Sequence, residues 1–427
     1  MLPIVERILA PGVVLRAVQT KKFKTSMLGI TFLEPLAEDT ASLNALIPKV
    51  LRRGTKNHPD METLSAALDD LYGGGIEPLV RKKGEAQCIG FWGSFLDDAY
   101  VPGDSRILES AASLLGEIVL QPAGEGDSFR LDYVESEKAN LVDKIRSEVN
   151  DKLQYSLSRL RGFMCEGEAY SIEKLGTESQ AKAITGEALY SRYRDMLATA
   201  PVYLYYCGSS DPARVEAAFR KAFIGLPQSQ RKEIPVPVVL DQPKGEVRRF
   251  SDTMEVSQGK LTMGFRTGGG FKDIESVARF MLFNAIFGGS TNSKLFLNVR
   301  EKLSLCYFAS SSLALSKGIL LVYSGVEFAN FQKAEDEILA QLTACQTGDI
   351  TLEELEAARR SVVGSLRSSL DAQGRLEEYW VNRFVTDTAY TPEELAEAVE
   401  KVTLDQVVEA ARQVKLDSIY TLRGKEG

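Results

Sequence analysis

Apolar side chains recur at helical spacing in the stretch ASLNALIPKVLRRGT, which begins at residue 41. They occupy positions i, i+3, i+4, i+7 and i+8, and this spacing predicts an amphipathic helix over residues 41–53 with one buried stripe: Leu43, Leu46, Ile47, Val50 and Leu51. At about 100° per residue, Ala45, Pro48 and Lys49 point away from that stripe. The helix therefore has a second face that an apolar core does not explain.

The same order of elements occurs twice along the chain. In each half a strand precedes two helices and a hairpin, which turns at Lys83-Gly84 in the first half and at Lys317-Gly318 in the second. A long helical segment follows each hairpin. In the first half the predicted ranges are a strand at 25–32, helices at 41–53 and 61–72, a hairpin at 76–95 and a helical segment at 129–164. In the second half they are a strand at 260–267, helices at 275–287 and 292–303, a hairpin at 307–326 and a helical segment at 351–385.

Helix start signals support this repeat near the end of each half. Thr185 and Thr403 are plausible helix caps, and each is followed by a helix and a strand. Two later helices begin with capping boxes, in which a threonine is followed three residues later by a glutamate: Thr351 with Glu354, and Thr391 with Glu394. The two halves are therefore predicted to be homologous domains.

A proline-rich stretch separates the two halves. Proline fixes the backbone and removes a hydrogen-bond donor, so the stretch LPQSQRKEIPVPVVLDQPKG is predicted to be an extended linker. We expect an α+β protein in which each domain has a mainly antiparallel sheet with helices packed on one face. The predicted boundaries are 1–228 for the first domain, 229–243 for the linker and 244–427 for the second domain.

Composition narrows the class of protein. The 427 residues carry a formal net charge of −8 with scattered Lys and Arg, which argues against nucleic acid as a ligand. The N-terminal stretch lacks the pattern of a signal peptide, and no run of about 20 apolar residues suggests a membrane span. Five isolated cysteines form no CxxC motif, so we expect a reducing, cytoplasmic setting.

The chain contains a single histidine, His58. A Ser/His/Asp or Cys/His catalytic arrangement would have to use this residue, and a metal site with two or three histidines is impossible within the chain. His58 lies between a turn and a helix that Asp60 is predicted to cap, so the simplest interpretation is a histidine in a surface loop.

Two motifs carry a resemblance to a known family. The segment FGGSTNSKLFLNVREKLSLCY, residues 287–307, resembles the second-domain signature of the insulinase/pitrilysin metallopeptidases, with a glycine loop, a helix ending in R-E-K and a strand. The segment LDDLYGGGIEPLV is similar to the family's segment after its metal-binding helix. The resemblance covers almost the whole chain and implies two α+β domains that form half of a clamshell.

Catalytic members of this family carry H-x-x-E-H on the first-domain helix. Counted back from the Gly-Thr pair at residues 54–55, the two histidine positions hold Ala45 and Lys49, and the glutamate position holds Pro48. A later helix supplies a third ligand in the family; here Glu137 remains seven residues earlier, but the ligand position holds Lys144. Alanine offers no donor atom and an ammonium group repels a dication, so we expect no zinc and no other cofactor in this chain.

The resemblance implies that second-domain residues are retained. In active relatives an arginine and a tyrosine reach the scissile peptide, and the matching residues are Arg300 and Tyr307. The loop with Gly288 and Gly289 matches the glycine loop that lets substrate approach the backbone. The alternatives are that Arg300 makes a surface ion pair, that Tyr307 begins a half-buried strand and that the loop is a plain turn.

Two classes of function follow from the resemblance. The first is the non-zinc subunit of a heteromeric peptidase, inactive alone, which binds peptide and completes the site of a zinc-bearing sibling. The bacterial subgroup associated with elongation factor P 5-aminopentanol modification, which the segment ESEKANLVDKIRSEVNDKLQYSLSRLRGFMCEGE resembles, often has such a sibling. The second is a non-catalytic peptide-binding or scaffold protein. A homodimer of the isolated chain is also plausible.

Overall fold

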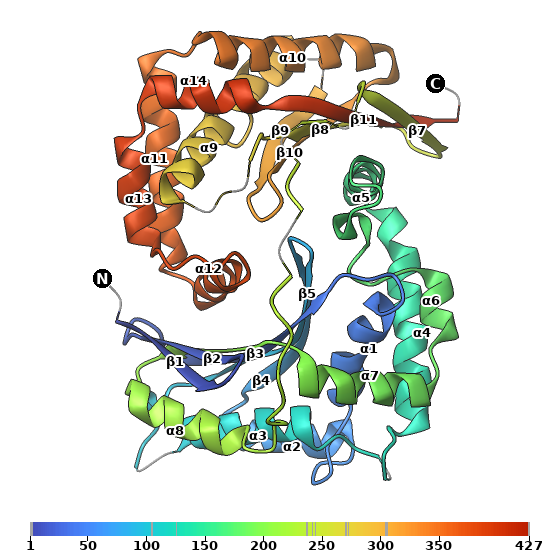
Figure 1. Ribbon diagram of the computed structural model, residues 1–427, viewed down its shortest axis with the longest axis vertical. Coiled ribbons are helices and arrows are strands. Elements are labelled where there is room, and N and C mark those ends of the chain that lie inside the picture. Colours follow the sequence, from blue (N-terminus) through green and yellow to red (C-terminus); the bar gives the residue numbers. More distant parts are fainter. Residues whose placement is uncertain are drawn as a thin grey trace. The chain divides into compact units, whose positions relative to one another are not determined.

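Two β-sheets organise the computed structural model, which is drawn in Figure 1. The chain forms two compact units, each with one sheet: Met1–Arg146 with Ile172–Pro235 and Glu377–Val381, and Ser147–Ser171 with Val236–Leu376 and Asn382–Gly427. The structure describes residues 3–103, 106–124, 126–235, 238–240, 242–243, 245–269, 271, 273–303 and 306–425, and for Lys302 it describes the backbone alone. Parts of the predicted linker and of the 287–307 signature lie outside the described residues.

The first unit contains a sheet of strand order β1-β2-β6-β3-β5-β4. All neighbouring strands are antiparallel except β2 and β6, which are parallel. Its strands are β1 (Ile4–Ala10), β2 (Val13–Gln19), β3 (Thr25–Pro35), β4 (Gly75–Lys83), β5 (Ala86–Leu96) and β6 (Val202–Gly208). Its helices are α1 (Ala41–Leu51), α2 (Met61–Asp69), η1 (Asp98–Tyr100), α3 (Ile107–Leu120), α4 (Leu131–Ser147), α6 (Glu178–Ala183), α7 (Gly186–Thr199) and α8 (Pro212–Ala222).

The second unit contains a sheet of strand order β7-β11-β8-β10-β9, with one parallel pair, β7 and β11. Its strands are β7 (Arg248–Met254), β8 (Gly259–Arg266), β9 (Cys306–Ala314), β10 (Ile319–Val326) and β11 (Lys415–Gly424). Its helices are η2 (Glu148–Asn150), α5 (Lys152–Met164), η3 (Ala169–Ser171), α9 (Ile274–Phe287), the π-helix η4 (Leu295–Lys302), η5 (Phe328–Asn330), α10 (Phe331–Thr347), α11 (Leu352–Ser369), α12 (Gln373–Val385), α13 (Pro392–Lys401) and α14 (Leu404–Gln413); the middle of α12, Glu377–Val381, belongs to the first unit.

The repeat predicted from the sequence is present in the topology. When β1 is set aside, the first sheet reads β2-β6-β3-β5-β4 and the second reads β7-β11-β8-β10-β9, with the single parallel pair at the same place. Both hairpins turn at their lysine-glycine pairs, where Gly84 and Gly318 have φ of 56° and 67°, a conformation that glycine adopts at little cost. The two-domain α+β prediction is therefore confirmed.

Helix boundaries follow the capping signals. Thr185 accepts a hydrogen bond from a backbone N–H in the first turn of α7, and capping boxes open α2, α6, α11, α13 and α14. The first unit's core lies between the sheet and its helices and includes the buried stripe of α1. Local capping residues thus mark where most of these helices begin.

Helix α5 packs on the second sheet, although it precedes the linker in sequence. Leu157, Leu160 and Met164 form a buried cluster with Ile319 of β10 and Tyr420 of β11, among others. Because side chains alternate between the faces of a strand, the buried neighbour of Ile319, Leu320, lies on the opposite face of the sheet. Helix α9 lies on the other side of this sheet from α5 (Figure 1). The second sheet thus has helices on both faces, and the residues that group in space differ from the predicted sequence boundaries.

Candidate functional site

Helix α1 carries the three residues that the resemblance matches to the family's H-x-x-E-H motif. The helix is buried on more than its apolar stripe, because α6, α7, β4 and β5 all contact it. Ala45 is fully buried, Pro48 is also buried and Lys49 is half-buried. The methyl group of Ala45 and the ring of Pro48 offer no donor atom to a metal, so this face of α1 serves packing.

Helix α4 carries the residues that the resemblance matches to the helix of the family's third ligand. Glu137 is buried and its carboxylate forms an ion pair with Arg53 just after α1, at 3.1 Å. The Arg53 guanidinium also lies over the ring of Tyr133, 5.0 Å from its centroid. Lys144 follows two helical turns after Glu137. The Glu137 carboxylate is therefore paired with the Arg53 guanidinium, and Lys144 adds a further positive charge on α4 itself.

Zinc does not fit the residues at these positions. A zinc site needs imidazole, thiolate or carboxylate donors, whereas the matching positions hold a methyl group, a pyrrolidine ring and two ammonium groups. Across the part of the chain that the structure describes, no group of three or more His, Cys, Asp or Glu side chains could hold a metal ion. We call this set (Ala45, Pro48, Lys49 and Lys144) the α1–α4 site.

Arg300 lies on η4, whose backbone has π-helical winding. The Leu303 N–H donates to the Asn298 carbonyl, which widens the helix by one residue relative to an α-helix. The Arg300 guanidinium stacks over Phe296, 4.6 Å from the ring centroid, and lies 3.5 Å from the Glu301 carboxylate. Its side chain is 40% exposed, so the guanidinium can still reach a ligand.

Tyr307 lies on β9, an edge strand of the second sheet. Phe308 pairs with Gly325 and Cys306 with Val326, so Tyr307 is the extra residue of a β-bulge. Cys306 is buried, while Tyr307 is 67% exposed. The bulge thus turns the phenol out of the sheet. Arg300 and Tyr307 together are called the η4–β9 site; between them, residues 304 and 305 lie outside the described residues.

Gly288 and Gly289 end α9 and have a structural reason to be glycine. The Ser311 N–H donates to the Gly288 carbonyl at 2.9 Å, and a β-carbon at Gly288 would lie 2.6 Å from the Ser311 hydroxyl. A β-carbon at Gly289 would clash with Asn284. Close packing against β9 explains Gly288, and close packing against the last turn of α9 itself explains Gly289. A role of either residue in holding substrate stays a prediction.

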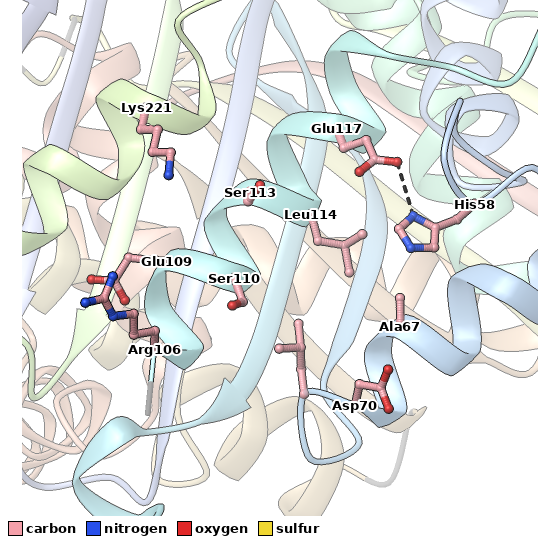
Figure 2. A pocket seen from close by; sticks show the side chains of 11 residues that line it. His58, Ala67, Asp70, Arg106, Glu109, Ser110, Ser113, Leu114, Glu117 and Lys221 are labelled. Atoms are coloured by element: carbon pink, nitrogen blue, oxygen red, sulfur yellow. Dashed lines mark hydrogen bonds and ion pairs between the residues drawn. The ribbon is translucent and has the colours of Figure 1, made fainter. Parts of the chain in front are cut away.

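The single histidine lies beside a pocket of about 480 Å³ on the first unit. Figure 2 shows its Nδ1 aimed at the carboxylate of Glu117 on α3, at 3.1 Å. Burial raises the pKa of Glu117, but hydrogen bonds from Thr55, Asn57 and His58 outweigh it and leave the pKa below its ordinary value. His58 therefore fastens the turn after α1 to α3. The partner, 59 residues away, had no signal in the sequence.

Comparison with known proteins places this chain in a family. The family model described as "Peptidase M16 inactive domain" matches residues 183–362. A curated relative in Bacillus subtilis (strain 168), "Probable inactive metalloprotease YmfF", is 34% identical over 422 residues and covers 97% of both chains. The chain belongs to the M16 peptidase family, which confirms the resemblance at the level of the family.

More distant relatives include proteins named as zinc proteases. "Uncharacterized zinc protease YmxG" of Bacillus subtilis (strain 168) is 24% identical over 243 residues, which is 56% of this chain and 58% of that protein. A solved structure, described as a conserved protein from Enterococcus faecalis V583, has a TM-score of 0.89 at 28% identity and covers 99% of each chain. The relatives thus include both a probable inactive metalloprotease and a zinc protease.

Membrane insertion through a helix has no support in the structure. Among the helices within the described ranges, none combines the length and the apolar character needed to cross a bilayer.

Proposed function

We propose that this chain is the non-zinc subunit of a heteromeric M16 peptidase, binding peptide and contributing Arg300 and Tyr307 to the site of a zinc-bearing partner. The observation that carries the proposal is the contrast between the two sites. The α1–α4 site has exchanged every donor for a group that cannot bind zinc, whereas the η4–β9 site keeps an exposed arginine and an exposed tyrosine.

Local backbone irregularities support a role for the η4–β9 site. A π-helical turn carries Arg300 and a β-bulge carries Tyr307. Both devices interrupt regular hydrogen bonding and are frequent beside functional sites, where they aim a side chain. Arg300 does form a surface ion pair with Glu301, but neither that ion pair nor a half-buried strand at Tyr307 would need such a device.

The chemistry of the two side chains suits a peptide. Guanidinium N–H groups can donate to a carbonyl or a carboxylate, and a phenol O–H can donate to the oxyanion that forms during peptide hydrolysis. Because β9 is an edge strand, its outer backbone groups can pair with an extended peptide beside Tyr307. Water activation would come from the partner.

A zinc-bearing partner is supported by two lines of similarity. Bacillus subtilis contains both a protein named as a probable inactive metalloprotease and one named as a zinc protease, and both are similar to this chain. The resemblance to the elongation factor P-associated subgroup, whose members often have an H-x-x-E-H sibling, points the same way. The non-catalytic scaffold is the alternative, and it requires no contribution from Arg300 or Tyr307.

The test is a mixing experiment with the zinc-bearing sibling and a pool of peptides, in a cytoplasmic buffer without detergent. We expect little cleavage by this chain alone and clear cleavage by the mixture. Arg300→Ala or Tyr307→Phe should lower cleavage by about 10²-fold or more, the effect of removing one oxyanion donor, while size-exclusion chromatography still shows the complex.

Matched controls come from exposed residues elsewhere. Tyr100, 48% exposed, and Arg367, with a 60% exposed side chain, should tolerate Tyr100→Phe and Arg367→Ala without loss of cleavage. If Arg300→Ala and Tyr307→Phe both support cleavage as well as the unmodified chain, the composite site is wrong and the scaffold role is favoured. The same chromatography of the chain alone shows whether it forms a homodimer.

A further inference from the structure

A second pocket in the first unit has apolar walls. Its volume is about 270 Å³, and β1, β2, β6, α8 and the segment after α8 contribute its lining. Five of the lining side chains are buried core residues: Val13, Leu204, Phe219, Phe223 and Leu226. Ile224, 83% exposed, also lines it. The walls therefore favour an aliphatic or aromatic group over a polar one.

Arg231 also lines this pocket, and the described residues that line it include no acidic side chain. The guanidinium donates to the carbonyls of Leu197 and Ala200 at the end of α7 and to that of Pro227. Within the described ranges, no carboxylate forms an ion pair with it. Burial lowers the pKa of Arg231, and no neighbouring charge opposes this effect.

The position of Arg231 is fixed. Its aliphatic stem packs on Gly12, where a β-carbon would lie 2.9 Å from the Arg231 Cβ. The hydrogen bonds to the three carbonyls use three of the five guanidinium N–H groups, which leaves two for a ligand. The other arginine that lines the pocket, Arg220, is already paired with Glu216. Arg231 is therefore the residue suited to an anion.

We propose that this pocket binds a medium-chain aliphatic carboxylate, such as a free fatty acid, with the chain between the apolar walls and the carboxylate beside Arg231. A volume of about 270 Å³ holds roughly nine groups the size of a water molecule, at about 30 Å³ each. That number matches a fatty acid of about eight carbons. This inference does not rest on the proposed function, because the pocket lies within the first unit and uses neither the α1–α4 nor the η4–β9 site.

The test is isothermal titration calorimetry of the purified chain with straight-chain carboxylates below their micelle concentrations. Each added methylene should tighten binding about fourfold up to octanoate, and longer chains should bring little further gain. Octanol should bind at least about tenfold more weakly than octanoate, because a neutral hydroxyl gains less from a guanidinium. Absence of saturable binding, or equal binding of octanol and octanoate, would overturn the proposal.

Two variants separate the contribution of the Arg231 charge to binding from that of the pocket volume. Arg231→Gln should weaken octanoate binding about tenfold and leave octanol unchanged. Ala10→Phe keeps the arginine but fills the pocket, so it should abolish binding of both compounds even if Arg231→Gln fails to fold. Lys221→Gln, an exposed change on α8 outside the pocket lining, should have no effect. Unchanged binding by Ala10→Phe, with its fold checked by circular dichroism, would place the ligand elsewhere.

Discussion

Replacing Arg266 by methionine is expected to lower the free energy of unfolding of the second unit by about 3–5 kcal/mol, the range for removing one partner of a buried ion pair. Arg266 is fully buried on β8 and lies 3.0 Å from both Asp417 and Glu168. It also donates to the Met164 carbonyl at 2.7 Å. Without it, two buried carboxylates lose a cation, and the Met164 carbonyl at the end of α5 keeps Arg248 but loses the shorter of its two hydrogen bonds from arginine.

The effect of Arg266→Met should depend on pH. Burial raises the pKa of Glu168, but Lys317 and Arg266 outweigh it and hold that pKa below its ordinary value of 4.5. Burial raises the pKa of Asp417 as well, but hydrogen bonds from Ser418, Arg266 and Arg248 outweigh it and leave that pKa below its ordinary value. A carboxylate whose pKa is lower in the folded than in the unfolded state stabilises the folded protein at pH values above the unfolded-state pKa. This stabilisation is lost as the pH falls through the folded-state pKa. The deficit of the variant should therefore be full at about pH 7 and shrink below about pH 4.

Urea unfolding followed by circular dichroism gives the measurement. The matched control is Arg367→Ala, since Arg367 and its partner Glu400 have 60% and 46% exposed side chains, and the loss there should be at most about 1 kcal/mol. A loss for Arg266→Met no larger than for Arg367→Ala would show that the buried cluster does not hold α5 on the sheet.

Gly116→Ala should destabilise the first unit by about 1–3 kcal/mol or more, through overpacking where α3 contacts α8. A β-carbon at Gly116 would overlap the Ala222 carbonyl oxygen and lie 2.9 Å from the carbonyl carbon. Backbone atoms cannot move aside as a flexible side chain can, so the two helices would have to separate.

A second helical glycine gives a control of opposite sign. Gly364 on α11 is exposed, and nothing lies within 4 Å of a β-carbon built there. Gly364→Ala should therefore stabilise the protein by about 0.5–1 kcal/mol, the gain in helix propensity. Thermal unfolding of both variants gives the comparison. Equal effects of the two substitutions would contradict the close approach of α3 and α8.

Local patterns predicted much of this fold. Apolar spacing indicated α1, the lysine-glycine turns indicated both hairpins, and threonine with a glutamate three residues later marked the starts of α11 and α13. The order of the repeat then required two similar sheets. These features depend on residues that are close together in the sequence, so they can be predicted from the sequence.

Features that depend on distant partners were not predictable. Glu168 and Arg266 are 98 residues apart, and their ion pair ties the segment Ser147–Ser171 to the second unit. The burial of Pro48 comes from elements that pack on both sides of α1. The strands β1, β2 and β7 and the helices α3, α8 and α10 were also absent from the predicted elements.

The two candidate sites also differ in how far they could be predicted from the sequence. The absence of zinc donors that the resemblance implies could be read directly from Ala45, Pro48, Lys49 and Lys144, because donor chemistry belongs to the residue type. The bulge at Tyr307 could not, since it is set by the pairing of β9 with β10, and the sequence analysis predicted an ordinary helix where the π-helical turn lies.

The most direct test of the central claim is the zinc content of the purified chain, measured by inductively coupled plasma mass spectrometry after incubation with excess zinc and dialysis. We expect no stoichiometric zinc and no peptide hydrolysis by the chain alone. One tightly held zinc ion per chain, lost on substitution of Lys49 or Lys144 and accompanied by hydrolysis, would contradict the claim.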